Sequence, residues 1–322
     1  MSTYVLRRLL LFVPTLVGAS ILIFVLLRLV PGDIAEILVY QTGSESSAVQ
    51  RRQIQQIRRE LGLDRPIAAQ YGDWVAGAVR GDFGQSYVQR RPVADILRER
   101  FPRSMELAIL TLLLAVIWAI PLGVVSAVRQ NGIVDYLARL VSLSGLSLPL
   151  FFTGALILYG LVRFFHWLPP LEFVAFTENP LENLKQLIWP ALAQAYYISA
   201  PIARLTRSQM LEVVRQDYVR TARAKGLVGF AVVVRHALKN ALIPIITIFG
   251  LQFGNLLAGA VIVETVFSRP GLGRLIVGGI LSKDFPLVQG TVLFVATAYV
   301  LINVLVDVAY AYADPRIRLM RA

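Results

Sequence analysis

The sequence contains no cysteine and only two histidines, His166 and His236. The absence of cysteine excludes disulfide frameworks, thiolate metal sites and cysteine nucleophiles, and two histidines argue against a zinc or haem centre. Charged residues are also scarce, at 16% of the 322 residues, whereas 56% are hydrophobic and the mean hydropathy is +0.63. Soluble globular domains carry more charge than this, so we expect a lipid bilayer to surround the chain.

Several motifs that carry chemistry are missing as well. The sequence has no GxxxxGK[ST] phosphate loop, no GxSxG or HExxH motif and no paired aspartates within its apolar runs. We therefore predict no catalytic residue and no metal ligand. If the chain takes part in transport driven by ATP, the ATPase is a separate polypeptide that docks on a cytoplasmic surface of the chain.

Six runs are long and apolar enough to span a bilayer, and the second to the fifth contain no Asp, Glu, Lys or Arg. The runs are residues 9–30, 107–128, 140–162, 187–203, 240–263 and 285–306. The fourth is the weakest, because it has 17 residues and includes Pro190, Gln194 and Pro201. The predicted fold class is an all-α integral membrane protein with six transmembrane helices.

The distribution of Lys and Arg predicts the orientation of these helices. With the N-terminus inside the cell, the inner segments carry fifteen of these residues and the short outer loops carry five. Both termini are therefore expected in the cytoplasm. Eight of the fifteen lie in the loop 204–239, more than anchoring requires, although anchoring of the topology remains the alternative role. The net charge of +12 thus fits a membrane protein rather than a nucleic-acid-binding one.

We divide the chain into a first transmembrane helix, a large extracytoplasmic cap, a core of five helices and a cytoplasmic tail, at residues 1–30, 31–106, 107–312 and 313–322. In the cap, an amphipathic helix is expected from Ser47 to Gly62 and a second helix after Pro66, followed by a turn from Gly81 to Gly84. The core includes the basic loop 204–239 and an outer hairpin, 264–284.

Within the basic loop, the sequence predicts a helix of about two turns that Asp217 caps and Gly226 ends. Val219, Ala222 and Gly226 form a small face against which a partner can press, while Arg220 and Arg223 share a basic side. A second helical piece from residue 230 continues without interruption into the fifth apolar run. Movement of the loop is therefore expected to reach a membrane helix directly.

Polar residues within the apolar runs are candidates for a pathway. Gln252 and Asn255 lie three apart and share a helix face with Gly259, so they either line a pathway or form bonds between helices. Glu264 either lines the exit or caps a helix. Asp307 is the candidate residue for an ion-coupled carrier, which is a weaker alternative because neither inverted repeats nor charges at mid-membrane are evident.

The outer hairpin begins at a turn that contains Pro270, Gly271 and Gly273. The apolar face that follows spans about nine residues, which is too few to cross a bilayer. We expect this short helix to lie against the outer mouth of the bundle.

Several segments together resemble one family. DYVRTARAKG at 217–226 and RHALKNALIP at 235–244 are similar to the cytoplasmic EAA-type loop of ABC importer permeases. LRLVPGD at 27–33, LGLDRPIAAQYGDW at 61–74, GDFGQS at 81–86, ETVFSRPGLGRL at 264–275 and the DPR tail at 314–316 resemble its dipeptide and oligopeptide branch, in the first-permease subunit. The family's Glu-Ala-Ala is replaced by Arg220, Thr221 and Ala222, so no contact of that glutamate is carried over.

The resemblance implies a type I ABC importer permease in a bacterial or archaeal cytoplasmic membrane. Its partners would be a homologous second permease, two cytoplasmic ATPase subunits that bind ATP and Mg, an extracytoplasmic binding protein and short peptides. The coupling helix would comprise Asp217, Tyr218, Val219, Arg220, Thr221, Ala222, Arg223, Lys225 and Gly226. The pathway would include Gln252, Asn255, Gly259 and Glu264, and the outer gate or binding-protein contact Pro270, Gly271 and Gly273.

Other interpretations stay open. Similar permeases move nickel chelates, glutathione or oligosaccharides, and the binding protein is expected to select the substrate. A membrane enzyme would need a convergent nucleophile, acid–base pair or metal set, none of which the sequence contains.

Overall fold

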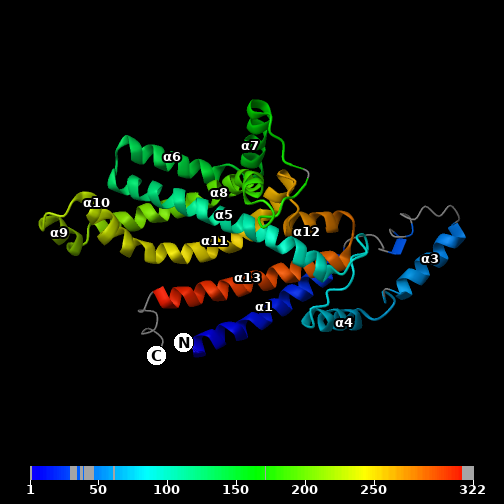
Figure 1. Ribbon diagram of the computed structural model, residues 1–322. Coiled ribbons are helices and arrows are strands. Elements are labelled where there is room, and N and C mark those ends of the chain that lie inside the picture. The colour runs from blue at the N-terminus through cyan, green and yellow to red at the C-terminus, as the bar shows by residue number, and fades with distance from the viewer. Residues whose placement is uncertain are drawn as a thin grey trace.

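The computed structural model describes residues 2–29, 35–36, 39, 47–60, 62–170 and 172–313 (Figure 1). Over these residues the fold is entirely helical, apart from one isolated antiparallel bridge between Gln85 and Pro92. The long helices lie roughly along a common direction, and their bounds are α1 (Ser2–Leu29), α5 (Val93–Val128), α8 (Pro180–Val214), α11 (Lys239–Val266) and α13 (Phe285–Ala313). The predicted tail, 313–322, lies outside the described residues apart from Ala313.

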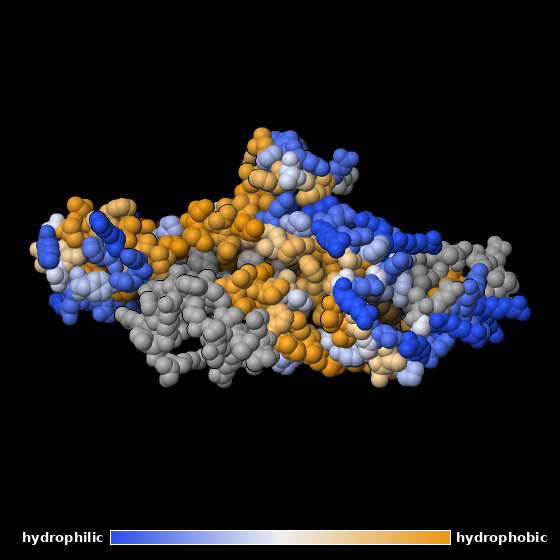
Figure 2. All heavy atoms as spheres, turned by 60° about the horizontal axis from the view of Figure 1, so that its bottom comes forward, coloured by the Kyte–Doolittle hydropathy of each residue, from blue (hydrophilic) through white to orange (hydrophobic). Residues whose placement is uncertain are grey.

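Three described helices are long and apolar enough to cross a membrane: α1 over Phe12–Leu29, α5 over Val93–Val128 and α13 over Phe285–Leu305. A bent pair, α6 (Ile133–Ser147) and α7 (Leu150–Phe165), passes the same test as a fourth. Figure 2 shows hydrophobic residues over much of the middle of the molecule and more hydrophilic ones toward its two ends. This distribution suits a bundle whose middle lies in lipid.

The third apolar run, 140–162, does not form the continuous helix expected of a single span. It breaks at Leu148 and Pro149, and α7 is bent by 106° from α6, so that α7 stands across the other helices in Figure 1. Pro149 has no backbone N–H to donate and disfavours the helical conformation of the residue before it. Leu148 accordingly adopts an extended conformation, with φ −84° and ψ 125°.

The second and fourth apolar runs are parts of longer helices. Helix α5 begins at Val93, so it crosses residue 106, the predicted end of the cap. The weak fourth run is the middle of α8, a helix of 35 residues. Small side chains line the contact between α5 and α8, and they let the two backbones come close. Ala115 and Ala119 of α5 and Ala195 of α8 are fully buried there.

The cap contains the two predicted helices, α3 (Ser47–Glu60) and α4 (Ile67–Val79). Gly62 has a positive φ of 66° just after α3, as expected for a helix stop. Helix α4 packs on α1 through aromatic side chains, with Phe24 5.2 Å from Tyr71 and 5.9 Å from Trp74 between ring centroids. The segment LRLVPGD at 27–33 lies largely outside the described residues.

The basic loop, predicted over 204–239, begins only after α8 ends at Val214. It then forms three helical pieces: α9 (Asp217–Ala224), α10 (Gly229–Ala231) and the π-helix η1 (Val232–Leu238), which continues directly into α11. Gly226 has φ +78° and ends α9 as predicted. Asp217 is the first residue of the helix rather than its cap; the cap position belongs to Gln216, which makes no side-chain capping bond. The short helix thus starts without the predicted side-chain cap.

Figure 1 places α9 and α10 toward the end of the bundle where α1 begins. Helices α3, α4 and α12 (Leu272–Leu281) lie toward the opposite end. We call these the inner end and the outer end of the bundle. The basic loop and the cap are thus well separated.

Candidate functional site

Helix α9 is attached to the rest of the chain by the small face that the sequence predicted. Val219 is fully buried and Ala222 is 7% exposed, and both pack with Val232 of η1 and with Val213 of α8. This face is therefore covered by the chain itself and is not open to a partner. The physical reason is that an isolated helix of two turns is unstable in water and needs an apolar contact to form.

The opposite face of α9 is exposed and polar. It carries the predicted coupling residues Asp217, Tyr218, Arg220, Thr221 and Arg223. Lys225 and Gly226 are also exposed but follow the last residue of the helix, so Gly226 does not belong to the small face to which the sequence pattern assigned it. Asp217 and Arg220 form an exposed ion pair at 3.8 Å, which contributes little to stability. The hydroxyl of Tyr218 accepts a hydrogen bond of 2.9 Å from the side chain of Asn240 at the start of α11. The exposed face is thus linked to the following helix.

A buried ion pair fastens α6 to α8 at the inner end of the bundle. The fully buried carboxylate of Asp135 accepts bonds of 2.8 and 2.9 Å from the guanidinium of Arg207 and one of 2.6 Å from the hydroxyl of Ser126. The backbone N–H of Asn131 adds a fourth bond of 3.0 Å. Sequence reasoning missed this pair, because the two residues are separated by 72 positions. A bidentate pair of an arginine and a carboxylate fixes the relative orientation of the two side chains as well as their distance.

Two of the predicted pathway residues lie at a contact between helices. Gln252 is buried, Gly259 lies against Gln194 of α8, and the side chain of Asn255 is outside the described residues. The amide of Gln194 donates to the backbone oxygen of Leu256 at 2.7 Å. Gln194 was noted only as a weakness of the fourth apolar run, but it joins α8 to α11. A polar residue in an apolar helix was the available signal.

Glu264 occupies a capping position rather than the wall of an exit. Its carboxylate is fully buried and accepts bonds from the hydroxyl of Ser104 at 2.6 Å and from the backbone N–H groups of Gly273 and Arg274 at 2.8 and 3.2 Å. The two N–H groups belong to the first turn of α12, where a negative charge is favourable. Glu264 therefore holds α5, α11 and α12 together.

The glycines of the outer turn are required for this arrangement. A Cβ at Gly271 would lie 2.0 Å from a carboxylate oxygen of Glu264, and a Cβ at Gly273 would lie 2.4 Å from the Cα of Val261. Pro270 accepts a bond of 3.2 Å from Arg100 through its backbone oxygen. The turn predicted as an outer gate is thus tightly packed against the ends of α5 and α11.

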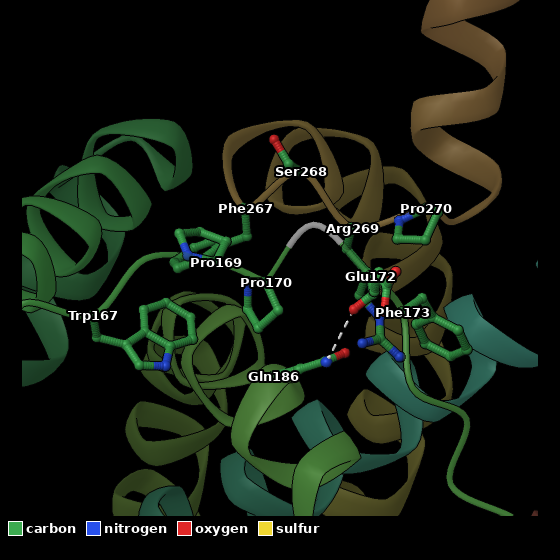
Figure 3. A pocket seen from close by; sticks show the side chains of 10 residues that line it. All are labelled: Trp167, Pro169, Pro170, Glu172, Phe173, Gln186, Phe267, Ser268, Arg269 and Pro270. Carbon is green, nitrogen blue, oxygen red and sulfur yellow. Dashed lines mark hydrogen bonds between the residues drawn. The ribbon is translucent and has the colours of Figure 1, made fainter. Parts of the chain in front are cut away.

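A second buried network, which includes Arg269, lies beside this turn; Figure 3 shows Arg269 among the residues that line the adjoining hollow. The guanidinium of Arg269, only 4% exposed, donates to Glu106 at 2.9 Å and lies 5.1 Å from the ring centroid of Phe173. Burial lowers the pKa of Arg269, and the charge of Glu106 opposes that shift. The hollow between Trp167, Gln186 and this turn has a volume of about 20 Å³, which is room for about one water and not for a solute.

Asp284, also fully buried, attaches the GDFGQS segment to the end of α12. Its carboxylate accepts bonds from the hydroxyl of Ser86 and from the backbone N–H groups of Tyr87 and Val88, the latter two at 3.2 Å. Burial and the charge of Asp284 raise the pKa of Tyr87 to about 12. The cap is thereby joined to the core. Among the described residues, no three His, Cys, Asp or Glu side chains gather as metal ligands.

Comparison with known proteins gives a family for nearly the whole chain. Residues 119–319 match the family described as binding-protein-dependent transport system inner membrane component. Residues 1–108 match the N-terminal part of the membrane component of such systems. Together these matches cover most of the helices described above.

Individual relatives align over almost their full length. A probable peptide ABC transporter permease protein of Sinorhizobium fredii is 39% identical over 318 residues, covering 99% of this chain and all of the relative. The glutathione transport system permease protein GsiC of Escherichia coli (strain K12) is also 39% identical, with 99% of each chain covered. A putative peptide transport system permease protein of Brucella abortus is 40% identical over 320 residues, again with 99% of each chain covered. The chain therefore belongs to the binding-protein-dependent transport system inner membrane components, and it is a multi-pass permease of the ABC-transporter type.

Proposed function

We propose that this chain is the permease subunit of an ATP-driven importer of short peptides and that α9 receives the movement of an ATPase subunit. The observation that carries the proposal is the position of α9. Its exposed polar face lies at the inner end, while η1 joins the loop without interruption to α11. A displacement of α9 is therefore transmitted to a long helix of the bundle.

The proposed topology has six spans, formed by α1, α5, the bent pair α6–α7, α8, α11 and α13. Both termini, with α9, would lie in the cytoplasm. The excess of Lys and Arg in the inner segments supports this orientation, as does the location of α9 at the end of the bundle where α1 begins. The cap and α12 would then face the outside of the cell.

The proposed complex contains this chain, a homologous second permease, two ATPase subunits that bind ATP and Mg, and an extracytoplasmic binding protein. Closure of the ATPase pair around ATP would move α9 and tilt α11, which opens the pathway outward. ATP acts here as a ligand that favours one arrangement of rigid bodies over another. The fully buried networks at Glu264 and Asp284 would make the outer end move as a unit.

Short peptides are the proposed substrate because two of the relatives above are named for peptide transport. Glutathione is the second candidate, since GsiC is similarly close in sequence. Nickel chelates and oligosaccharides remain lesser alternatives. An ion-coupled carrier is disfavoured, because the buried carboxylates of Asp135, Glu264 and Asp284 are all held by hydrogen-bond donors; the side chain of Asp307 lies outside the described residues.

The experiment reverses charge on the exposed face of α9, with Arg220→Glu and Arg223→Glu combined. Neither side chain supports the fold, so the permease should remain in the membrane. Recovery of the ATPase subunits with the purified permease and uptake of tri-L-alanine should both fall by about tenfold. The reason is that the two glutamates would face the acidic residues with which the ATPase is proposed to meet Arg220 and Arg223, and like charges across an interface repel. The control is Arg98→Glu at the outer end, where the side chain is 82% exposed. Unchanged ATPase recovery in the double variant would place the docking site elsewhere.

A further inference from the structure

The outer end of the bundle contains a cavity of about 500 Å³ that none of the networks described above fills. Its walls come from α5, α12 and the segment that follows GDFGQS, and they include Gln89, Arg100, Arg274, Leu275, Gly278 and Leu287. A volume of this size is typical of a site for a small molecule. It exceeds what one side chain of a docked protein would occupy.

The cavity is positively charged, since none of its lining residues is acidic and two are arginines. The carboxylate of Glu99, which acts electrostatically on Arg100, is already shared by Arg91 at 3.3 Å and Arg103 at 2.9 Å. Among the described residues, neither Arg100 nor Arg274 has an acidic group within ion-pair distance. Neither guanidinium of the cavity is thus paired with a carboxylate of the described residues.

Both arginines are held in place but keep donors free. Arg100 donates one bond of 3.2 Å to the backbone oxygen of Pro270, and its buried Nε has no partner among the described residues. Arg274 donates to the backbone oxygen of Ser268. A guanidinium has five N–H donors in a planar fork, so each arginine can still bind a carboxylate. Anchored arginines lose little further freedom when they bind.

The remaining wall suits the rest of an amphipathic ligand. Leu275 and Leu287 provide an apolar surface, and Gly278 has no side chain to obstruct the space. We propose that this cavity binds the free carboxylate of a transported peptide at the outer end of the permease, through Arg100 and Arg274. The inference rests on the proposed function, because it takes the substrate to be a peptide that arrives from outside.

The test uses the complete transporter in proteoliposomes with Arg100→Gln and Arg274→Gln combined. The probes are tri-L-alanine and its C-terminal amide, with uptake divided by the amount of each peptide loaded on the binding protein. In the unmodified transporter, the free acid should enter about tenfold faster than the amide per loaded binding protein, and the variant should lower the acid to the rate of the amide. Arg98→Gln, an exposed arginine on the same helix, is the matched control.

Two further measurements keep the result decisive. Arg100→Lys with Arg274→Lys keeps both charges, so it should restore part of the preference for the acid and show that the cavity is still formed. Affinity of the empty binding protein for the complex should stay the same in all variants. Equal uptake of acid and amide by the unmodified transporter, or weaker docking of the empty binding protein in the Gln variant, would overturn the inference. Failure of the unmodified transporter to take up either peptide would instead overturn the proposed peptide function, and the inference with it.

Discussion

The two ends of the bundle are held together in different ways. At the outer end, buried charged side chains join segments far apart in the sequence, as Glu264 does with Ser104 and Asp284 with Ser86. At the inner end, α9 is attached mainly by a few apolar side chains, Val219 and Ala222 against Val213 and Val232. The outer end is thus fixed by several directional bonds, whereas α9 is held by a small apolar contact, although the buried pair of Asp135 and Arg207 joins α6 to α8 at the same inner end.

Because of this difference, the outer end resists rearrangement, whereas α9 can adapt to a partner. Removing one partner of a buried hydrogen-bonded charge leaves the others unsatisfied, so the outer end resists rearrangement. A small apolar contact costs little to shift, so α9 can adapt to a partner without unfolding the bundle. We therefore expect outer substitutions to affect the fold and inner substitutions to affect coupling.

The largest effect is expected from Glu264→Ala, which leaves three donors near the start of α12 without their acceptor. The loss of stability should be about 3 kcal/mol or more, at roughly 1–3 kcal/mol per unsatisfied donor. Thermal unfolding in detergent and the yield of monodisperse protein measure it. Glu178→Ala, at an exposed position, is the control. A variant as stable as the control would show that the outer end does not depend on this carboxylate.

A smaller loss is expected from Gly271→Ala. The new methyl group would lie 2.0 Å from the Glu264 carboxylate, and such overpacking typically costs about 1–3 kcal/mol. Gly278→Ala is a matched control on α12, because nothing lies within 4 Å of its Cβ position and alanine favours a helix. The same unfolding assay should rank Gly271→Ala below the unmodified protein and Gly278→Ala level with it or above. The reverse order would contradict the close approach of this turn to Glu264.

At the inner end, Ala222→Arg should release α9 while the bundle stays folded. The change in global stability should stay within about 1 kcal/mol, because only the small contact with Val213 and Val232 is lost. Recovery of ATPase subunits with the permease should fall severalfold. Gln130→Arg, at an exposed position in the turn between α5 and α6, is the control. Global unfolding of Ala222→Arg would show that the inner end is as integral to the fold as the outer end.

The most local effect, confined to the order of α9, is expected from Gly226→Ala. A left-handed conformation at φ +78° costs a residue with a Cβ about 1–2 kcal/mol, although nothing lies within 4 Å of the added atom. Faster hydrogen exchange over 217–226, with no change elsewhere, is the expected result. Gly226→Asn should exchange more slowly than the alanine variant, since asparagine tolerates this conformation. Identical exchange in all three proteins would mean that Gly226 does not limit the order of α9.

Features that depend on neighbouring residues in the chain could be predicted from the sequence. The stops at Gly62 and Gly226, and the helix that follows Pro66, depend on local backbone conformation and were confirmed. The break at Pro149 was missed, because the run 140–162 is apolar on both sides of the proline. Hydropathy shows that a segment is apolar but not where its helix changes direction. Pairs such as Asp135 with Arg207 were not predictable, since only the packing of α6 on α8 brings them together.

The π-helix η1 sets the direction in which α9 projects from the bundle. Its hydrogen bonds run from residue i to i+5, so its turns hold more residues than those of the α-helix that follows. Deleting one residue within 232–238 would let this stretch adopt ordinary α-helical spacing and would leave the direction of the preceding segment nearly unchanged, because the wide turn absorbs the extra residue. Deleting one residue from the first turns of α11 would instead rotate the preceding segment by about 100° around the helix axis. The inner loop therefore keeps its direction only while the surplus residue and the wide turn are matched, and a change of chain length in the α-helical part would aim the same side chains at a different neighbour.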